Sequence, residues 1–241
     1  MKITDFFSPN FDKKIRPNKS IKIIIIHYTG MQSERESLLR LCNRKSKVSS
    51  HFFINTKGKI YRLIQSNKIA WHAGKSCWGK YKNLNKNSIG IELVNKGHKF
   101  GYTNFPKKQI SSLVKLCNEL IKKYKIKNKN IVGHSDIAPL RKIDPGEKFP
   151  WEKLAYKQIG IWHNLQPNIL RKYRNVKIFK KREKEKFIKS LIKIGYCFSL
   201  SKKYFFKKII KAFQRHYRKE LINGKLDKEC LIIAQNLSKK L

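Results

Sequence analysis

The chain has 241 residues, of which 40% are hydrophobic and 12% aromatic, and its formal net charge is +42. This composition can supply a core and therefore excludes wholesale disorder, while the length suits one domain of ordinary size plus a small second one. The charge favours an anionic partner such as a cell-wall polymer, a membrane surface or nucleic acid, but a coding bias toward lysine would produce the same composition with no function attached.

The first part of the chain predicts strands and a short helix. Ile23–Ile26 is a β-branched run without polar alternation, which indicates a strand buried on both faces that ends at His27. Glu34–Asn43 carries apolar residues between charges and suits a short helix. Ser50–Asn55 and Lys59–Gln65 flank a glycine-containing turn, so they predict a β-hairpin.

The middle of the chain alternates between loop and regular structure. Ala70–Asn87 is rich in Gly, Asn and Ser without clear periodicity, so we expect a long ordered loop of the kind that is usually functional. Ser88–Val94 alternates and places Glu92 within a strand, where an unpaired carboxylate is costly. Pro106–Tyr124 has helical spacing and precedes a strand at Asn130–Gly133.

After a short helix at Trp151–Tyr156 the composition changes. We expect a first domain over residues 1–165, a basic linker or solvated helix over 166–186, and a helical domain over 187–241. The last part predicts three helices, at Phe187–Ile194, Tyr204–Tyr217 and Asp227–Leu237, with Asp227 as a natural N-cap. The predicted fold is α/β: a mixed central β-sheet flanked by helices, followed by a small three-helix C-terminal domain.

Two histidines and one aspartate stand where a metal site is commonly built. His134 ends an apolar run, and Asp144 follows a polar loop and precedes a Pro-Gly turn. A catalytic zinc usually takes three protein ligands and a water, so a third ligand must come from elsewhere, and His27 is the candidate. Each histidine taken alone is more often a capping or core residue, but two strand ends would present two imidazoles together.

Six blocks of sequence occur in a fixed order: Ile26–Thr29, Val48–Phe52, Ala70–Gly74, Ser88–Leu93, Gly133–Pro139 and Arg141–Gly146. Together, over about Ile21–Trp162, they resemble the zinc-dependent N-acetylmuramoyl-L-alanine amidases of the AmpD and AmiD type. A weaker pattern, Leu191-x-x-x-Gly195-Tyr196, Ala212–Tyr217 and Gly224–Asp227, looks like the helical peptidoglycan-binding domain of AmiD-type amidases. We therefore expect the C-terminal helices to aid wall binding rather than chemistry.

The resemblance implies a hydrolase with one zinc ion per chain, held by His27, His134 and Asp144. Its substrate would be the amide between N-acetylmuramic acid, or its 1,6-anhydro form, and L-alanine of the stem peptide. Glu92 would transfer protons, and Lys142 would stabilise negative charge on the tetrahedral intermediate. From the residues alone, Glu92 could instead form a salt bridge, and Lys142 could be one more surface lysine.

The resemblance also implies substrate contacts from Lys47, Trp71 and Asn85, with Lys47 standing where some relatives have arginine. His51 and His72 are expected to be structural or to line the cleft rather than to bind metal. The expected partner is peptidoglycan or a muropeptide fragment, the expected state is a monomer, and no specific nucleic acid is expected. The alternative is a non-catalytic peptidoglycan-recognition protein, because related folds bind wall fragments without cutting them.

The cysteines are odd in number, widely spaced and form no Cys-x-x-Cys motif: Cys42, Cys77, Cys117, Cys197 and Cys230. We interpret them as unpaired thiols of a reducing compartment. The first nine residues lack the apolar core of a secretory signal, and no run approaches the length of a membrane span. These features predict a cytoplasmic protein, or a periplasmic or secreted one if a leader is missing.

Overall fold

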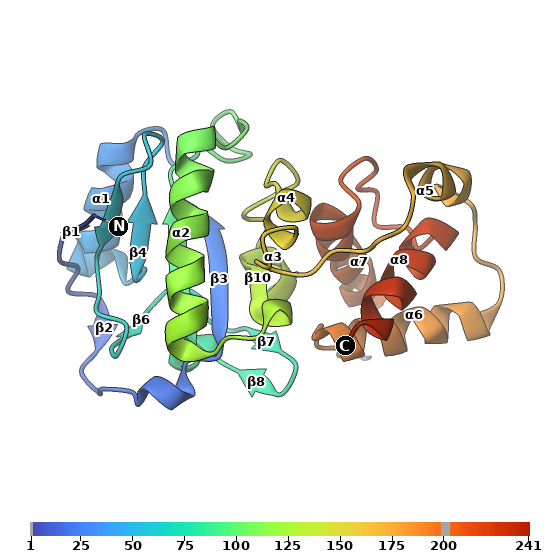
Figure 1. The fold of residues 1–241 in the computed structure, drawn as a ribbon, viewed down its shortest axis with the longest axis horizontal. Helices are drawn as coiled ribbons and strands as arrows, with labels where there is room; N and C mark the ends of the chain where they lie inside the picture. The colour runs from blue at the N-terminus through green and yellow to red at the C-terminus, as the bar shows by residue number, and fades with distance from the viewer. Residues whose placement is uncertain (1, 199–202) are drawn as a thin grey trace.

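The computed structural model describes residues 2–198 and 203–241. A twisted β-sheet with one long helix across it forms the N-terminal part, and a group of helices lies beyond the sheet's last strand (Figure 1). The predicted α/β class, with a central sheet flanked by helices, is confirmed. None of the described helices is long and apolar enough to cross a membrane.

The strands are short apart from two neighbours in the main sheet, β3 and β9, which have six residues each. They are β1 (Ile3–Asp5), β2 (Phe11–Asp12), β3 (Ile23–Tyr28), β4 (Phe52–Ile54), β5 (Ile60–Arg62), β6 (Ile69–Ala70), β7 (Cys77–Trp78), β8 (Tyr81–Lys82), β9 (Ser88–Leu93) and β10 (Ile131–Gly133). The helices are α1 (Glu34–Cys42), α2 (Lys107–Tyr124), α3 (His134–Ile137), α4 (Trp151–Ala155), α5 (Pro167–Tyr173), α6 (Lys181–Ile194), α7 (Lys203–Tyr217) and α8 (Lys228–Lys239).

In the described part of the chain, six strands form the main sheet in the order β1-β5-β4-β9-β3-β10. Strand β3 pairs in parallel with β9 on one side and with the edge strand β10 on the other. Every residue of Ile23–Ile26 is fully buried, as the unbroken β-branched run predicted. The register sets His27 directly opposite Glu92, so the sheet itself brings two of the predicted site residues together.

The two faces of the sheet carry different layers. Helix α2 packs its apolar side on the face that holds Ile24, Ile26 and Ile91, in agreement with the predicted amphipathic helix. The opposite face holds Ile23 and Ile25 and, two residues further along the strand, His27. Because side chains alternate along a strand, the site lies on the face away from α2.

The predicted hairpin is present as antiparallel β4 and β5, but the predicted long loop Ala70–Asn87 is not structureless. It contains the two-residue strands β7 and β8 and a 3-10 turn at Leu84–Lys86. Strands of two residues leave no periodic signal in a sequence, so composition alone could not reveal them.

The three predicted C-terminal helices correspond to α6, α7 and α8, and Asp227 caps α8 by accepting a hydrogen bond from the Cys230 amide at 2.9 Å. The predicted linker 166–186 is partly helical, because α5 lies within it and α6 begins at Lys181, before the expected Phe187. The lysine-rich start of α6 is a solvent-facing helical surface, which shares its composition with a linker.

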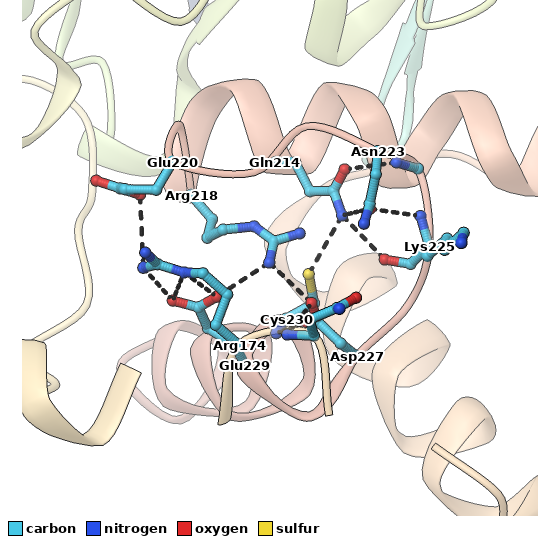
Figure 2. A network of polar contacts seen from close by, with 11 residues as sticks. Arg174, Gln214, Arg218, Glu220, Asn223, Lys225, Asp227, Glu229 and Cys230 are labelled. Carbon is cyan, nitrogen blue, oxygen red and sulfur yellow. Dashed lines mark hydrogen bonds and ion pairs between the residues drawn. The ribbon is translucent and has the colours of Figure 1, made fainter. Parts of the chain in front are cut away.

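A buried network of charges ties α5, α7 and α8 together (Figure 2). The guanidinium of Arg218 contacts Asp227 at 2.8 Å and Glu229 at 3.0 Å. The guanidinium of Arg174 donates two further hydrogen bonds to the carboxylate of Glu229. Gln214 closes the preceding turn by bonding the backbone at Gly224 and Lys225. Such charges are tolerated in a core only when paired, so the network fixes how these helices pack.

The C-terminal helices share a hydrophobic core with the sheet. One cluster of buried residues joins Ile23, Ile25 and Trp78 of the N-terminal part to Phe187, Phe213 and others of the helices. A disulfide also joins Cys77 of β7 to Cys197, which follows α6. The prediction of five unpaired thiols is therefore wrong, because pairing across 120 residues depends on the fold and cannot be seen in local spacing.

Candidate active site

One possible ligand atom from each of His27, His134 and Asp144 converges on one point beside the carboxyl ends of β3 and β10. His27 Nδ1 lies 3.0 Å from His134 Nδ1, and Asp144 Oδ2 lies 3.1 Å from both. All three side chains are buried. His27 belongs to β3, while His134 begins the short helix α3 immediately after the neighbouring parallel strand β10.

These residues fit a zinc ion. A tetrahedral zinc about 2.0–2.2 Å from each ligand separates the ligand atoms by roughly 3.3–3.6 Å, within a few tenths of an ångström of the observed triangle. Burial and the neighbouring His134 lower the pKa of His27 to about 4, which keeps its imidazole neutral. Burial opposes ionisation of Asp144, but the adjacent histidines outweigh it and hold the pKa of that carboxyl below its usual range. A neutral imidazole and an ionised carboxylate are the forms that bind metal.

The outer nitrogens of both histidines are anchored. His27 Nε2 lies 3.0 Å from His72 Nδ1, and His134 Nε2 lies 3.3 Å from the carbonyl oxygen of Ala73. Arg141 donates to the same carbonyl and to that of Lys75. Contacts of this kind fix the tautomer and the ring orientation of metal-binding histidines.

His72 lines the same cleft as the candidate ligands, and His51 lies behind it, so neither belongs to the triangle of possible ligand atoms. The ring of His72 sits against Gly90, where a Cβ atom would come within 2.5 Å of the ring, so glycine at this position makes room for it. His72 also contacts Ser88, and His51 contacts Arg16 at 2.8 Å. Burial holds the pKa of both imidazoles well below the usual value. They support His27 as neutral structural groups.

The pairing of β9 with β3 places the acid Glu92 beside the candidate site. Burial raises the pKa of Glu92 to about 8, the charge of Asp144 adds to this, and Lys142 opposes it. Its Oε2 atom is buried without a hydrogen-bond partner among the described residues. A carboxyl group of this kind can hold or release a proton near neutral pH, which suits general acid–base work. The salt bridge considered from the sequence is absent from the described part of the chain.

A cleft of about 530 Å³ opens onto the three candidate ligand residues. Glu92 and Lys142 both line it, together with Trp71 and Arg141. Lys142 lies two residues before Asp144, in the loop that follows α3. The structure therefore brings the predicted acid, the predicted cation and the predicted ligands to one cleft.

The three predicted substrate contacts are placed differently from one another. Trp71 lines the cleft, and its indole nitrogen donates to Asp12 at 2.6 Å. The side-chain oxygen of Asn85 accepts from the amides of His72 and Ala73, so Asn85 supports the loop behind the site. Lys47 is exposed, next to the lining residues Val48 and Ser49. Arg141, to which the sequence assigned no role, lies in the cleft itself.

Comparison with known proteins agrees with this geometry. The family model described as N-acetylmuramoyl-L-alanine amidase matches residues 17–147, a range that contains all three candidate ligand residues, Glu92 and Lys142. The chain belongs to this amidase family. AmiD of Escherichia coli (strain K12) is 35% identical to it over 237 residues, covering 91% of this chain and 83% of that protein. AmpD of Haemophilus influenzae is 35% identical over 164 residues, covering 61% of this chain and 86% of that protein.

Solved amidase structures share the fold over almost the whole chain. The complex of E. coli AmiD with the substrate anhydro-N-acetylmuramic acid-L-Ala-D-gamma-Glu-L-Lys superposes with a TM-score of 0.80 at 34% identity, covering 95% of this chain and 92% of that one. AMPDH3 from Pseudomonas aeruginosa gives a TM-score of 0.81 at 29% identity, covering 96% of both chains. The similarity to these amidases therefore extends through the C-terminal helices.

Proposed function

We propose that this protein hydrolyses the amide bond between N-acetylmuramic acid, or its 1,6-anhydro form, and L-alanine of the peptidoglycan stem peptide, using one zinc ion per chain. The observation that carries the proposal is the triangle of His27, His134 and Asp144, which lines a cleft together with the half-buried Glu92. Membership of the amidase family supports the bond that is cut.

The residues divide the chemistry between them. Zinc bound by the three ligands would lower the pKa of its bound water and polarise the scissile carbonyl. The carboxylate of Glu92 accepts a proton as water attacks, and Glu92 then donates it to the departing nitrogen. The ammonium of Lys142 stabilises the negative charge that develops on the carbonyl oxygen. Trp71 offers an apolar wall for the substrate.

The proposed partners are muropeptide fragments and peptidoglycan, whose stem peptides carry the L-alanine that the reaction releases at a new amino terminus. A monomer suffices, because every proposed catalytic group and ligand comes from one chain. Incubation of the purified protein with anhydro-muropeptide, followed by mass spectrometry, tests the proposal. Release of free stem peptide is expected. Binding of the muropeptide without release would favour the non-catalytic recognition protein instead.

Replacing Lys142 by alanine is expected to lower kcat by roughly 10²- to 10³-fold, the cost typical of losing one donor to the oxyanion. The zinc content should stay near one per chain, because Lys142 is not a ligand. Steady-state kinetics with a soluble muropeptide and elemental analysis of the same sample measure both quantities. Lys153→Ala, which changes an exposed lysine of α4, is the matched control. A normal kcat in Lys142→Ala would remove this residue from the mechanism.

We also propose that the protein works in an oxidising compartment, because the Cys77–Cys197 disulfide spans the two parts of the chain and such bonds persist outside the reducing cytosol. Alkylation of the protein recovered from cells and unfolded in denaturant without reductant, followed by mass spectrometry, should modify Cys42, Cys117 and Cys230 and leave the other two unmodified until reduction. Modification of all five cysteines before reduction would favour the cytoplasm predicted from the sequence.

A further inference from the structure

Asp136, two residues after the candidate ligand His134, is held by groups from both parts of the chain. The backbone amide of Gly133 donates to its Oδ2 at 2.8 Å. From the C-terminal helices, the Tyr196 hydroxyl donates to Oδ1 at 2.6 Å and His216 Nδ1 lies 2.7 Å from Oδ2. A carboxylate can only accept, so His216 carries its proton on Nδ1. Asp136, Tyr196 and His216 are at most 4% exposed.

The turn that contains Asp136 also sets the geometry of the candidate metal site. Helix α3 begins at His134, and the carboxylate of Asp136 closes its first turn by bonding back to Gly133. Within the same turn, the Ser135 amide donates to the carbonyl oxygen of Asp144 at 2.8 Å. Two of the three candidate ligands therefore depend on how this single turn is oriented.

The two C-terminal donors are themselves fixed in place. The two residues next to Tyr196 are both bonded to the β7–β8 hairpin. The Gly195 carbonyl accepts a hydrogen bond from the Gly79 amide, and Cys197 forms the disulfide with Cys77. The ring of His216 stacks on Trp151, with 3.9 Å between ring centroids and 15° between planes. Groups pre-positioned in this way lose little freedom when they bond to Asp136.

Asp136 needs these donors because it is buried. A buried carboxylate left without partners carries the full cost of its desolvation, and each lost bond to a charged group costs more than a neutral one. Without Tyr196 and His216, only the Gly133 amide would remain among the described donors. The carboxylate would then turn toward water and release the first turn of α3.

We propose that Tyr196 and His216 are positioning residues of the metal site, which act through Asp136 to fix the orientation of His134. This gives the C-terminal helices a role beyond the wall binding expected from the sequence. The inference rests on the proposed function, because it assumes that His134 is a zinc ligand.

Zinc affinity of the full-length protein tests the proposal, measured on metal-free samples by competition with a chromophoric chelator at fixed pH. Tyr196→Phe removes one hydroxyl and keeps the ring, and His216→Phe keeps a stacking ring on Trp151 but removes the donor. Loss of an outer-shell partner typically weakens metal binding about 10- to 100-fold. We expect a loss of about 10-fold in the double variant and less in each single variant.

Two further variants separate positioning from general packing. Tyr217→Phe alters a neighbouring buried tyrosine that makes no hydrogen bond to Asp136 among the described contacts, and it should keep wild-type zinc affinity. In the background of Asp136→Asn, the Tyr196 and His216 variants should have little further effect, because they act through that carboxylate.

The outcomes distinguish this inference from the proposed function. Wild-type zinc affinity in the folded double variant, with only the melting temperature lowered, would show that Tyr196 and His216 serve packing alone. If the wild-type protein itself binds no zinc, the proposed function fails, and the inference fails with it.

Discussion

Removal of zinc is expected to reduce hydrolysis of a soluble muropeptide to background, and one equivalent of zinc should restore it. The reason is that three buried side chains converge within 3.1 Å of one another and supply nitrogen and oxygen donors suited to zinc. Dialysis against a chelator, elemental analysis and a rate assay on the same sample measure the effect.

Single ligand variants sharpen this prediction. His134→Ala should lose both zinc and activity, because two protein ligands do not hold a catalytic zinc. His98→Gln is the matched control, since His98 is exposed, pairs with Glu147 and lies outside the ligand triangle. Full activity in a verified metal-free sample would contradict the proposed role of zinc.

Replacing Glu92 by glutamine is expected to lower kcat by roughly 10²- to 10⁴-fold, the range typical of losing a positioned proton-transfer group. The amide has the same shape as the carboxyl group, so the strand and the zinc content should be preserved. Because proton transfer occurs in the transition state, the loss should fall on kcat more than on KM. Steady-state kinetics and zinc analysis of the same protein provide the measurement.

Glu152→Gln, in the exposed first turn of α4, is the control for a general effect of removing a negative charge from this basic protein. It should behave like the wild type. Loss of zinc in Glu92→Gln would assign Glu92 a structural role instead, and a near-normal kcat would exclude it as the acid–base group.

Much of the site could be predicted from the sequence because it is built from local signals. The run Ile23–Ile26 indicates a buried strand, and in parallel strands the residues that follow the carboxyl ends meet at one edge, which places His27 near His134. The Pro-Gly turn after Asp144 is also a signal that can be recognised from adjacent residues alone. The alternation of apolar and polar residues around Glu92 predicts that it lies in a strand. The register between this strand, β9, and β3 then places Glu92 opposite His27.

The features that could not be predicted depend on contacts between distant segments. Cys77 and Cys197 are ordinary isolated cysteines in the sequence, and only the docking of α6 against the β7–β8 hairpin brings them together. Asn85 lies in a predicted substrate loop, but its side chain faces the backbone of the preceding segment. His216 falls within the weaker pattern Ala212–Tyr217, which indicates no contact with the first domain, and its contact with Asp136 joins residues 80 positions apart.

The position of β3 between β9 and β10 also determines when the metal site can exist during folding. His27 is 107 residues from His134 and 117 from Asp144, so the ligands meet only after parallel strands from distant parts of the chain have paired. Closing such long loops is slow, because their entropy is lost before the contacts form. A partly folded chain without β10 on β3 has no ligand triangle, so zinc bound at the proposed site would stabilise the completed sheet over every earlier state by mass action.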